Sequence, residues 1–325
     1  MKAAVVTDAG LTVQDVPRPQ PKANEILVRV HASGLNRAEL AIAAGNRHGG
    51  VGGTGTVVGL EWAGEVVEIG TDVPSGTVQL GDRVMCTGSG GYAEYAVCDW
   101  GRASKIPSEA LSFVKAAALP MALQTMHDAL ITNGQLQTGE SVLIQGASSG
   151  VGLMGLQIAR AKGARLVIGS STNPARQARL KEFGADLAID TADQTWPDKV
   201  TAATDGKGVD LIVDHISATV STANMKAAAV KGRIINVGRL GGTKGEFDFD
   251  LHALKRIQYT GVTFRTRSVD EVREIVRRMR DDLWPLVRSG KLGLPIDRTF
   301  PLDEAAAAQA HMRANLHFGK IVLIC

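Results

Sequence analysis

The sequence has little of what marks secreted, membrane-spanning or zinc-stabilised proteins. Its three cysteines, Cys86, Cys98 and Cys325, form no C-x-x-C pair and no dense framework, which favours a reducing compartment and argues against a structural zinc site. No stretch approaches the roughly 18 uninterrupted apolar residues of a membrane span, and the first residues lack the apolar core of a signal peptide. We therefore expect a cytoplasmic protein.

The sequence also has little excess of charge of either sign. The 36 lysines and arginines nearly balance the 33 aspartates and glutamates, for a net charge of +3 with no long basic run. We therefore expect no nucleic-acid partner and no membrane partner. Hydrophobic residues make up 44% and charged residues 21% of the 325 residues, which excludes a mainly disordered chain and leaves room for two domains.

What the sequence does contain is a strand, a glycine turn and a helix in direct succession. Ser141–Gln145 is an apolar, β-favouring run, and Val151–Lys162 repeats apolar residues at a helical period. Gly146, Gly150 and Gly152 punctuate the turn between them. Such a turn directs free backbone N–H groups and the positive end of a helix dipole at an anion. We interpret it as the seat of a dinucleotide pyrophosphate.

The strict dinucleotide pattern G-x-G-x-x-G is not met in this turn. Its three glycine positions hold Ala147, Ser149 and Gly152. Because glycine-containing turns between a strand and a helix are common in α/β proteins, an ordinary tight turn remains the alternative interpretation.

The N-terminal part of the chain is rich in predicted strands. Apolar and polar residues alternate in Glu25–Ala32, so every second residue from Ile26 would share one face. The glycine-rich stretch Gly45–Gly59, which contains His48, is expected to be a mobile loop near the site, with a plain flexible linker as the alternative.

From Pro107 the pattern changes to a helical stretch over Ser108–Leu130, broken at Pro120, and then to alternating strands and helices. This alternation demands right-handed crossovers and predicts a doubly wound parallel sheet. A helix over Ser268–Arg288 and a closing strand over Lys320–Ile324 are expected to return to the first domain. The predicted strands of the sheet are Ser141–Gln145, Arg165–Ser170, Leu187–Ile189, Val209–Val213, Gly232–Val237 and Ile257–Val262, and the helices are Val151–Lys162, Asn173–Phe183, Pro197–Thr204, Val220–Ala228 and Leu251–Lys255.

The end of the second strand of this sheet indicates the cofactor. In NAD-binding units a carboxylate at this position holds the ribose 2′-hydroxyl. Here the strand ends in Ser170 and Ser171 without an acid, and Arg176 follows at the start of the next helix. Hydroxyls and a guanidinium suit a 2′-phosphate, because a phosphate dianion needs charge-assisted donors and a carboxylate would repel it. We predict NADPH rather than NADH, and the alternative is that Arg176 is a solvated helix residue.

Short motifs spread over nearly the whole chain occur in a specific order and spacing. They are Glu25–Val30 running into Gly34–Leu40, Gly59–Glu61, Gly81–Val84, Gly91–Tyr95, Gln145–Gly152 and Gly319–Leu323. Together they resemble the zinc-independent branch of the medium-chain dehydrogenase/reductase superfamily, and within it the NADPH:quinone oxidoreductases and related enone reductases.

The resemblance implies an α/β protein of two domains. A GroES-like β-barrel domain for the substrate would comprise residues 1–121 and 265–325, and a Rossmann domain for NADPH would comprise residues 122–264. Members of this family usually form homodimers by pairing the sheet edges of their cofactor domains, so a homodimer is expected.

The resemblance also assigns site residues by position. Asn36 and Thr125 correspond to positions near the nicotinamide and are the catalytic candidates. As alternatives, Asn36 is a turn-stabilising amide, and Val237 and Leu240 are plain core residues. The expected cofactor-binding residues are Ser149, Gly150 and Val151 at the pyrophosphate, Ser170, Ser171 and Arg176 at the 2′-phosphate, Val237, Gly238 and Leu240 beside the nicotinamide, and Phe264, Phe318 and Lys320 closing over the cofactor.

The same comparison bears on zinc. Zinc-dependent relatives place a cysteine where Asn36 stands and a histidine where Leu60 stands. Leucine cannot ligate a metal, and an amide is a poor zinc ligand beside a thiolate or an imidazole. The seven histidines show no metal-binding spacing among themselves. We expect no metal site.

Without a metal to stabilise an alkoxide, reduction of a conjugated acceptor is less demanding than oxidation of an alcohol. The prediction is an NADPH-dependent reductase of quinones or α,β-unsaturated carbonyls. An enoyl-thioester reductase of the same family and a non-catalytic NADPH-binding protein are the alternatives. The chain departs from the better-known quinone reductases at Ala41, Arg47 and Thr191, where those carry tyrosines, so the substrate stays open.

Overall fold

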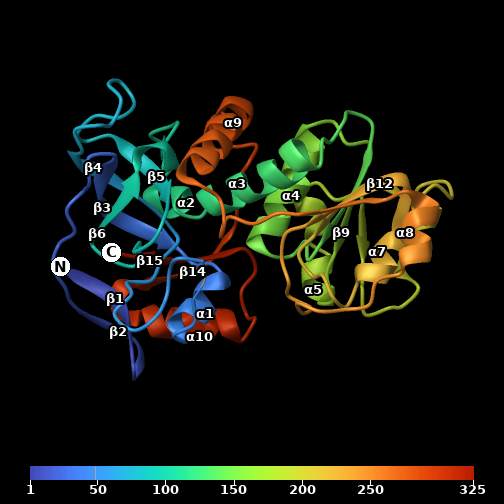
Figure 1. The fold of residues 1–325 in the computed structure, drawn as a ribbon, viewed down its shortest axis with the longest axis horizontal. Coiled ribbons are helices and arrows are strands. Elements are labelled where there is room, and N and C mark those ends of the chain that lie inside the picture. The colour runs from blue at the N-terminus through green and yellow to red at the C-terminus, as the bar shows by residue number, and fades with distance from the viewer. Residues whose placement is uncertain (48) are drawn as a thin grey trace. The chain divides into compact units, whose positions relative to one another are not determined.

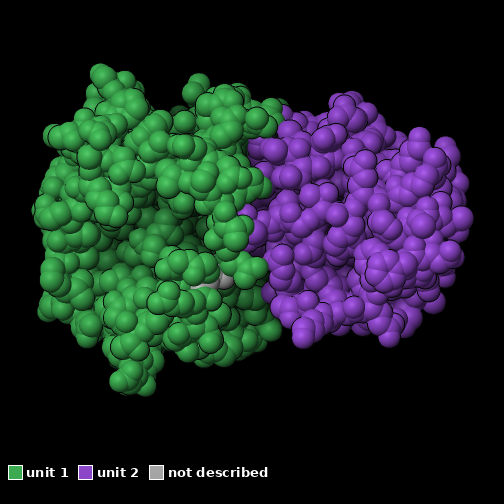
Figure 2. Space-filling view, in the orientation of Figure 1, with its two compact units in different colours: residues 1–121, 264–325 green, residues 122–263 purple. Residues whose placement is uncertain are grey.

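The computed structural model describes residues 1–47 and 49–325 of the chain. His48, in the predicted glycine-rich loop, lies outside the described residues. The chain divides into two compact units, which Figure 2 colours separately. Unit 1 is formed by residues 1–121 and 264–325, from both ends of the chain, and unit 2 is the continuous segment 122–263.

Unit 1 is built on a seven-stranded, largely antiparallel sheet (Figure 1). β3 lies inside it and pairs with β4, β6 and β15. Ile26, Val28 and Val30 of β3 are buried in one apolar cluster with Trp62, as strand alternation predicts. The strands are β1 (Lys2–Thr7) and β2 (Gly10–Asp15), which form a separate two-stranded sheet, and β3 (Glu25–Gly34), β4 (Glu61–Ile69), β5 (Arg83–Thr87), β6 (Tyr95–Asp99), β7 (Ala103–Lys105), β14 (Ile296–Pro301) and β15 (Lys320–Ile324).

The longest helix of unit 1 is α9 (Val269–Arg288). Its first turn is closed by a capping box, in which the Ser268 hydroxyl accepts from the Glu271 N–H and the Glu271 carboxylate accepts from the Ser268 N–H. The other helices of unit 1 are α1 (Ala38–Ala43), α2 (Phe113–Ala116) and α10 (Ala305–Arg313), with short 3-10 helices η1 (Trp100–Arg102) and η4 (Leu302–Glu304).

α3 (Pro120–His127) begins in unit 1 and continues into unit 2, where the π-helix η2 (Asp128–Asn133) follows it. The helical stretch predicted over Ser108–Leu130 is interrupted between α2 and α3, and Pro120 is the first residue of α3. A proline at the first position of a helix costs little, because its missing N–H would have no partner in the helix.

Unit 2 contains a six-stranded sheet in the order β10-β9-β8-β11-β12-β13, and every neighbouring pair is parallel. The predicted doubly wound sheet is therefore correct. Its strands are β8 (Ser141–Gln145), β9 (Leu166–Ser170), β10 (Leu187–Ile189), β11 (Val209–Asp214), β12 (Ala228–Asn236) and β13 (Gln258–Gly261). Its helices are α4 (Gly150–Ala161), α5 (Pro174–Gln177), α6 (Trp196–Ala203), α7 (Ser221–Ala227), α8 (Phe249–Lys255) and the 3-10 helix η3 (Leu180–Phe183).

Two predicted elements of unit 2 differ from the structure. The helix predicted over Asn173–Phe183 is split into α5 and η3. β12 begins at Ala228, directly after α7, whereas the sequence predicted a strand only from Gly232. In the part of the chain that the structure describes, no helix is long and apolar enough to cross a membrane.

Candidate functional site

The glycine turn of unit 2 follows β8 directly and depends on two of its glycines. Gly146 has a φ of +68°, in the left-handed region that side chains disfavour. A Cβ on Gly152 would lie 2.6 Å from the Cα of Ala147 and 2.6 Å from the carbonyl oxygen of Gly146. A larger residue at either position would force the turn apart, so the turn is built for close backbone packing.

The turn leads into α4, a helix with a defined N-cap. The Ser149 hydroxyl accepts from the Gly152 N–H (3.1 Å) and donates to the Gly146 carbonyl (2.9 Å). The N–H groups of Gly150 and Val151 belong to the first helical turn, where a helix offers no acceptor. These two groups are in place to receive an anion at the positive end of the helix.

Ser170 at the end of β9 supports this turn from behind. It is 1% exposed, and its hydroxyl accepts from the Gly146 N–H (2.9 Å) and donates its proton to Oε1 of Gln145 (2.6 Å). We predicted Ser170 as a contact of a 2′-phosphate, but its only proton is already donated inside the protein. In this structure Ser170 holds the glycine turn in place.

The segment after β9 offers the remaining polar groups. The Ser171 hydroxyl lies 3.1 Å from the hydroxyl of Ser148 in the glycine turn. Asn173 caps α5 by accepting from the N–H of Arg176 (3.0 Å), and Arg176 itself is half-buried. Hydroxyl and guanidinium groups thus follow β9 in the short segment that leads away from the turn.

The carboxyl ends of β11 and β12 carry the residues predicted beside the nicotinamide. The N–H groups of Val237 and Gly238 donate to the Asp214 carbonyl (2.8 and 3.1 Å), so this loop is tied to β11. Leu240 is 53% exposed, and the alternative that it is a core residue is therefore wrong. Val237 is half-buried.

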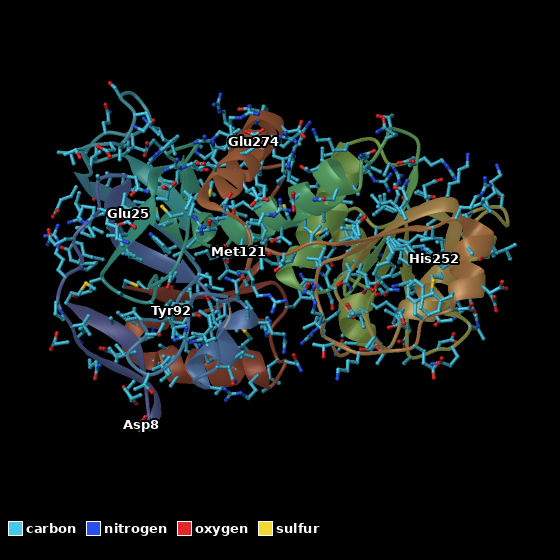
Figure 3. All side chains as sticks on the ribbon, viewed as in Figure 1. Asp8, Glu25, Tyr92, Met121, His252 and Glu274 are labelled. Carbon is cyan, nitrogen blue, oxygen red and sulfur yellow. The ribbon has the colours of Figure 1, made fainter. Side chains whose placement is uncertain are left out.

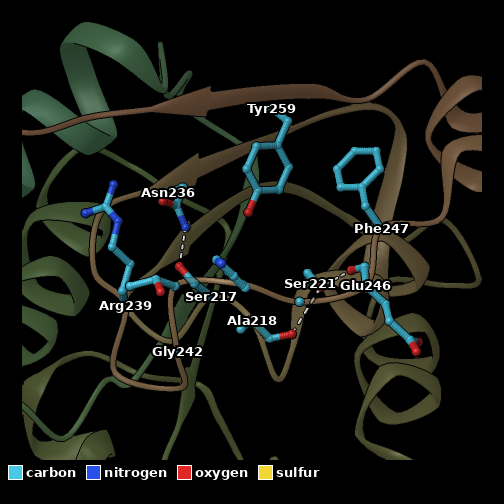
Figure 4. A pocket seen from close by; sticks show the side chains of 12 residues that line it. Ser217, Ala218, Ser221, Asn236, Arg239, Gly242, Glu246, Phe247 and Tyr259 are labelled. Carbon is cyan, nitrogen blue, oxygen red and sulfur yellow. Dashed lines mark hydrogen bonds between the residues drawn. The ribbon is translucent and has the colours of Figure 1, made fainter.

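A pocket of about 200 Å³ lies near the ends of β11, β12 and β13 (Figure 4). Ser217 donates to the Gly238 carbonyl (2.5 Å) and Ser221 to the Glu246 carbonyl (2.6 Å), so both hydroxyls are already engaged. Figure 4 shows the Tyr259 ring above them, with its hydroxyl directed into the pocket. The pocket is small, and the two serine hydroxyls in its lining already donate to backbone carbonyls. The lining comes from residues 217–259, outside the glycine turn.

Unit 1 contains a buried polar cluster around Asn36, Glu61 and Lys320. The Lys320 ammonium donates to three oxygens: the Leu35 carbonyl (2.6 Å), Asn36 Oδ1 (3.1 Å) and Glu61 Oε1 (2.5 Å). Glu61 also accepts from Asn36 Nδ2 (3.0 Å) and from the N–H of Met121 (2.8 Å). Glu61 is 0% and Lys320 5% exposed, so the ion pair is shielded from water.

A second buried carboxylate, Glu39, lies beside this cluster. It accepts from the N–H groups of Asn36 (2.6 Å) and Leu60 (2.7 Å) and from the hydroxyl of Tyr92. Figure 3 labels Tyr92 in unit 1. Burial raises the pKa of Glu39 to about 7, although these three hydrogen bonds oppose the shift. Glu39 therefore titrates near neutral pH.

Comparison with known proteins identifies the family. The alcohol dehydrogenase GroES-like domain model matches residues 22–108, and the zinc-binding dehydrogenase model matches residues 150–281. A quinone oxidoreductase of Rattus norvegicus is 30% identical over 315 residues, which are 95% of this chain and 92% of that protein. The chain belongs to the medium-chain dehydrogenase/reductase superfamily. The predicted family and the predicted fold class, a GroES-like domain with a Rossmann sheet, are confirmed.

Solved structures of this superfamily share the fold. A quinone oxidoreductase of Escherichia coli complexed with NADPH has a TM-score of 0.87 over 100% of this chain and 99% of that chain, at 22% identity. The CurK enoyl reductase has a TM-score of 0.86 over 99% of this chain and 98% of that chain, at 25% identity. The first curated relatives, mycobacterial polyketide synthases, are much longer, and the chain spans about 14% of their length.

Asn36 and Leu60 are the two positions that the resemblance compares with zinc ligands of zinc-dependent relatives. Leu60 is 8% exposed and packs in an apolar cluster with Leu35 and Tyr92. No group of three or more His, Cys, Asp or Glu side chains that could hold a metal ion occurs within residues 1–47 and 49–325. The positive charge next to Asn36 and Glu61 is the Lys320 ammonium.

Other predicted site residues have definite places in the two units. Phe318 is 9% exposed, and its N–H donates to Asp297 (3.1 Å). Phe264 and Thr125 are half-buried, in unit 1 and unit 2 respectively. Lys320 was predicted to close over the cofactor. In the structure its ammonium group donates hydrogen bonds to three oxygens of unit 1. The sequence analysis did not predict the ion pair between Lys320 and Glu61. Glu61 directly follows an apolar run, and this position was the one sequence signal for a buried charge.

Proposed function

We propose that this protein is a zinc-independent, NADPH-dependent oxidoreductase that delivers hydride to a quinone or an α,β-unsaturated carbonyl compound. One observation carries the proposal: the anion-binding end of unit 2. There the first-turn N–H groups of α4 lie beside a segment with hydroxyl and guanidinium groups. That segment, residues 170–176, contains no carboxylate. The quinone oxidoreductases among its relatives support the same activity.

The residues present fit a phosphorylated dinucleotide. Backbone N–H groups at a helix N-terminus suit the pyrophosphate, and the tight packing at Gly152 lets the backbone come close to it. Arg176 supplies the positive charge of this segment for the 2′-phosphate. The Ser171 hydroxyl, which lies 3.1 Å from the Ser148 hydroxyl, follows Ser170 in the same segment. The bound nicotinamide would supply the hydride, and the chain would hold and orient it.

Asn36 stays our candidate for the substrate side. Its amide is held by two bonds, because Nδ2 donates to Glu61 and Oδ1 accepts from Lys320. The second proton on Nδ2 faces the Gly34 carbonyl at 3.5 Å, a weak contact. We propose that this N–H group donates a hydrogen bond to the carbonyl oxygen of the substrate. Negative charge collects on that oxygen as hydride enters the conjugated carbon.

A second candidate function is reduction of an enoyl thioester. The likeness to the CurK enoyl reductase favours it, and so do the matches to polyketide synthases. A thioester substrate presents the same conjugated carbonyl to the hydride, so the residues assigned above would serve both reactions. Binding of NADPH without turnover is the third alternative.

An absorbance assay at the nicotinamide band separates these functions. The purified protein is given NADPH or NADH with 1,2-naphthoquinone, a simple enone or crotonyl-CoA in turn. We expect oxidation of NADPH with the quinone or the enone. Faster turnover with crotonyl-CoA would favour the thioester reductase, and binding without turnover on any acceptor would favour the non-catalytic alternative. Turnover with NADH alone would contradict the 2′-phosphate assignment.

We also propose a homodimer. β13 is the last strand in the order of the unit 2 sheet, and its Gln258 and Gly261 are exposed. An open strand edge of this kind can pair with the same edge of a second copy. Light scattering of the full chain tests this, and a monomer at micromolar concentration would contradict it. Residence in the cytoplasm stays a prediction from the sequence.

A further inference from the structure

A buried histidine at the end of β11 has no part in the function proposed above. His215 is 6% exposed, and its Nε2 atom is buried without a hydrogen-bond partner among the residues that the structure describes. A buried polar atom that finds no partner is costly and rare in folded proteins. Because Nε2 of His215 lies at the end of a central strand, its missing hydrogen-bond partner points to a bound ligand.

The sheet register places His215 at the glycine turn. β8 and β11 are neighbours in which Asp214 pairs with Gln145, so the next residues, His215 and Gly146, lie opposite each other. A Cβ on Gly146 would be 3.5 Å from the Cβ of His215. The chain leaves β8 toward β9 and leaves β11 toward β12, in opposite directions along the sheet. Open α/β sheets bind their ligands at such a point.

The side chain of His215 lies on the same face of the sheet as α4. Asp214 and Gln145 both bond to Asn224 of α7 (3.0 and 2.7 Å), so they face α7. Because successive side chains of a strand point to opposite faces, the residue that follows Asp214, His215, is directed to the other face of the sheet. α4 covers that side, since a Cβ on its Gly155 would contact Ile144 of β8 at 3.5 Å.

The order of the strands shows which half of a dinucleotide would reach His215. The 2′-phosphate, on the adenosine half, is assigned to the segment after β9, and the pyrophosphate to the turn after β8. β11 is the next strand beyond β8, on the side away from β9. A dinucleotide that crosses these three strand ends in order therefore brings its nicotinamide half to β11.

We propose that His215 binds the nicotinamide half of the dinucleotide, through a hydrogen bond between Nε2 and a hydroxyl of the ribose in that half. This inference rests on the proposed nucleotide-binding function. Burial lowers the pKa of His215 to about 4, so the imidazole is neutral at neutral pH. A hydroxyl both donates and accepts, and it can therefore pair with either tautomer of a neutral imidazole.

Equilibrium titrations with two probes test this assignment. NADPH carries both halves, whereas adenosine 2′,5′-bisphosphate carries only the adenosine half and its 2′-phosphate. Replacement of His215 by Phe keeps a ring in the site and removes the nitrogen atoms. We expect His215→Phe to weaken NADPH and NADH about tenfold and to change the affinity for the bisphosphate less than about twofold. The matched control, Arg176→Ala, should weaken NADPH and the bisphosphate and spare NADH.

The outcomes separate this inference from the proposed function. Unchanged NADPH affinity in His215→Phe, or equal weakening of NADPH and the bisphosphate, would overturn the role of His215 while the NADPH function stands. Failure of the unaltered protein to bind either dinucleotide would overturn both.

Two further measurements keep the test valid if the phenylalanine variant does not fold. His215→Gln places an amide nitrogen near the position of Nε2 and should keep NADPH affinity within about threefold of the unaltered protein. In the unaltered protein, the ¹⁵N resonance of the His215 imidazole should shift with NADPH and not with the bisphosphate. The same shift with both probes would contradict the assignment.

Discussion

Lys320 and Glu61 form an ion pair in which neither charge is exposed to water. Each partner has further hydrogen bonds, with Asn36 bonded to both, so the charges are compensated within the cluster. The net stability of such a pair is small, because removing two charges from water offsets most of their attraction. Loss of one partner is different, since the other charge is then left buried and unpaired.

Replacement of Lys320 by Met is therefore expected to lower the free energy of unfolding by about 3–5 kcal/mol. Urea unfolding of the full chain measures this change. The double variant Lys320→Met/Glu61→Gln removes the orphaned charge and should recover at least about 1 kcal/mol of the loss. A single variant as stable as the unaltered protein would show that Glu61 is solvated rather than buried.

The Glu39 carboxyl makes stability depend on pH near neutrality. Its pKa in the folded protein is about 7, against an ordinary value of 4.5 for a glutamate. Between these pH values the folded protein keeps a proton that the unfolded chain has lost, so stability falls as the pH rises and levels off above the folded pKa. Over this window Glu39 contributes a decline of about 3 kcal/mol at most.

The variant Tyr92→Phe tests the assignment of this decline to Glu39. The Tyr92 hydroxyl donates to the carboxylate and lowers its pKa. Its removal should raise the pKa of Glu39 further and move the decline in stability to higher pH. Urea unfolding between about pH 5 and 9 for both proteins checks this. If the two pH profiles have the same midpoint, another group is responsible for the decline.

At the scale of elements, the sequence predicted best where its period was strong. β8, β10 and β15 begin and end where the apolar runs predicted, and α4 differs from its prediction by one residue at each end. The predictions were weaker for short helices such as α5, whose ends depend on capping by Asn173 rather than on an apolar stripe. α10 was missed, because its run of alanines has no clear amphipathic pattern.

The same contrast applies to the candidate site. The glycine turn could be located from sequence, because its glycines are close together in the chain. The partnership of Lys320 with Glu61 joins residues 259 positions apart, and no local pattern encodes such a contact. The role of Ser170 could not be predicted either, since the direction of one hydroxyl depends on where Gln145 lies.

α9 buries an apolar face along its length, and Arg273 adds a charged contact between the helix and the end of β6. Its guanidinium donates to both carboxylate oxygens of Asp99 (2.9 and 2.7 Å) and stacks 4.8 Å from the ring centre of Trp100. Asp99 is 8% exposed, so the pair is largely shielded from solvent. This contact fixes the long helix after the chain returns to unit 1.

Replacement of Arg273 by Ala should therefore lower the free energy of unfolding by about 2 kcal/mol, because a mostly buried carboxylate loses its charged partner. Arg277→Ala on the same helix is the matched control. The Arg277 side chain is 54% exposed and pairs with Glu274 and Asp281 at the surface, so its loss should cost less than about 0.5 kcal/mol. Equal effects of the two substitutions in urea unfolding would contradict the attachment of α9 through Asp99.

At the scale of the whole molecule, we expect cofactor binding to stabilise unit 2 directly. The groups assigned to the pyrophosphate and the 2′-phosphate lie in unit 2, whereas the Lys320 and Glu39 clusters lie in unit 1. A ligand that binds only the folded protein stabilises it by about 2.7 kcal/mol when its concentration is a hundred times its dissociation constant. NADPH should therefore raise the midpoint of whichever thermal transition includes unit 2, and at equal concentration it should do so more than NADH.

Arg176→Glu tests this preference in the intact chain. A carboxylate at this position would repel the 2′-phosphate, which NADH lacks, so the thermal shift with NADPH should fall to the level of NADH while the shift with NADH is unchanged. Arg179→Glu serves as the control, because Arg179 lies nearby in sequence but pairs with Glu182 (3.2 Å). Differential scanning calorimetry with each nucleotide measures all three proteins. An equal loss of both shifts in Arg176→Glu would mean that Arg176 supports the fold of the segment rather than the phosphate.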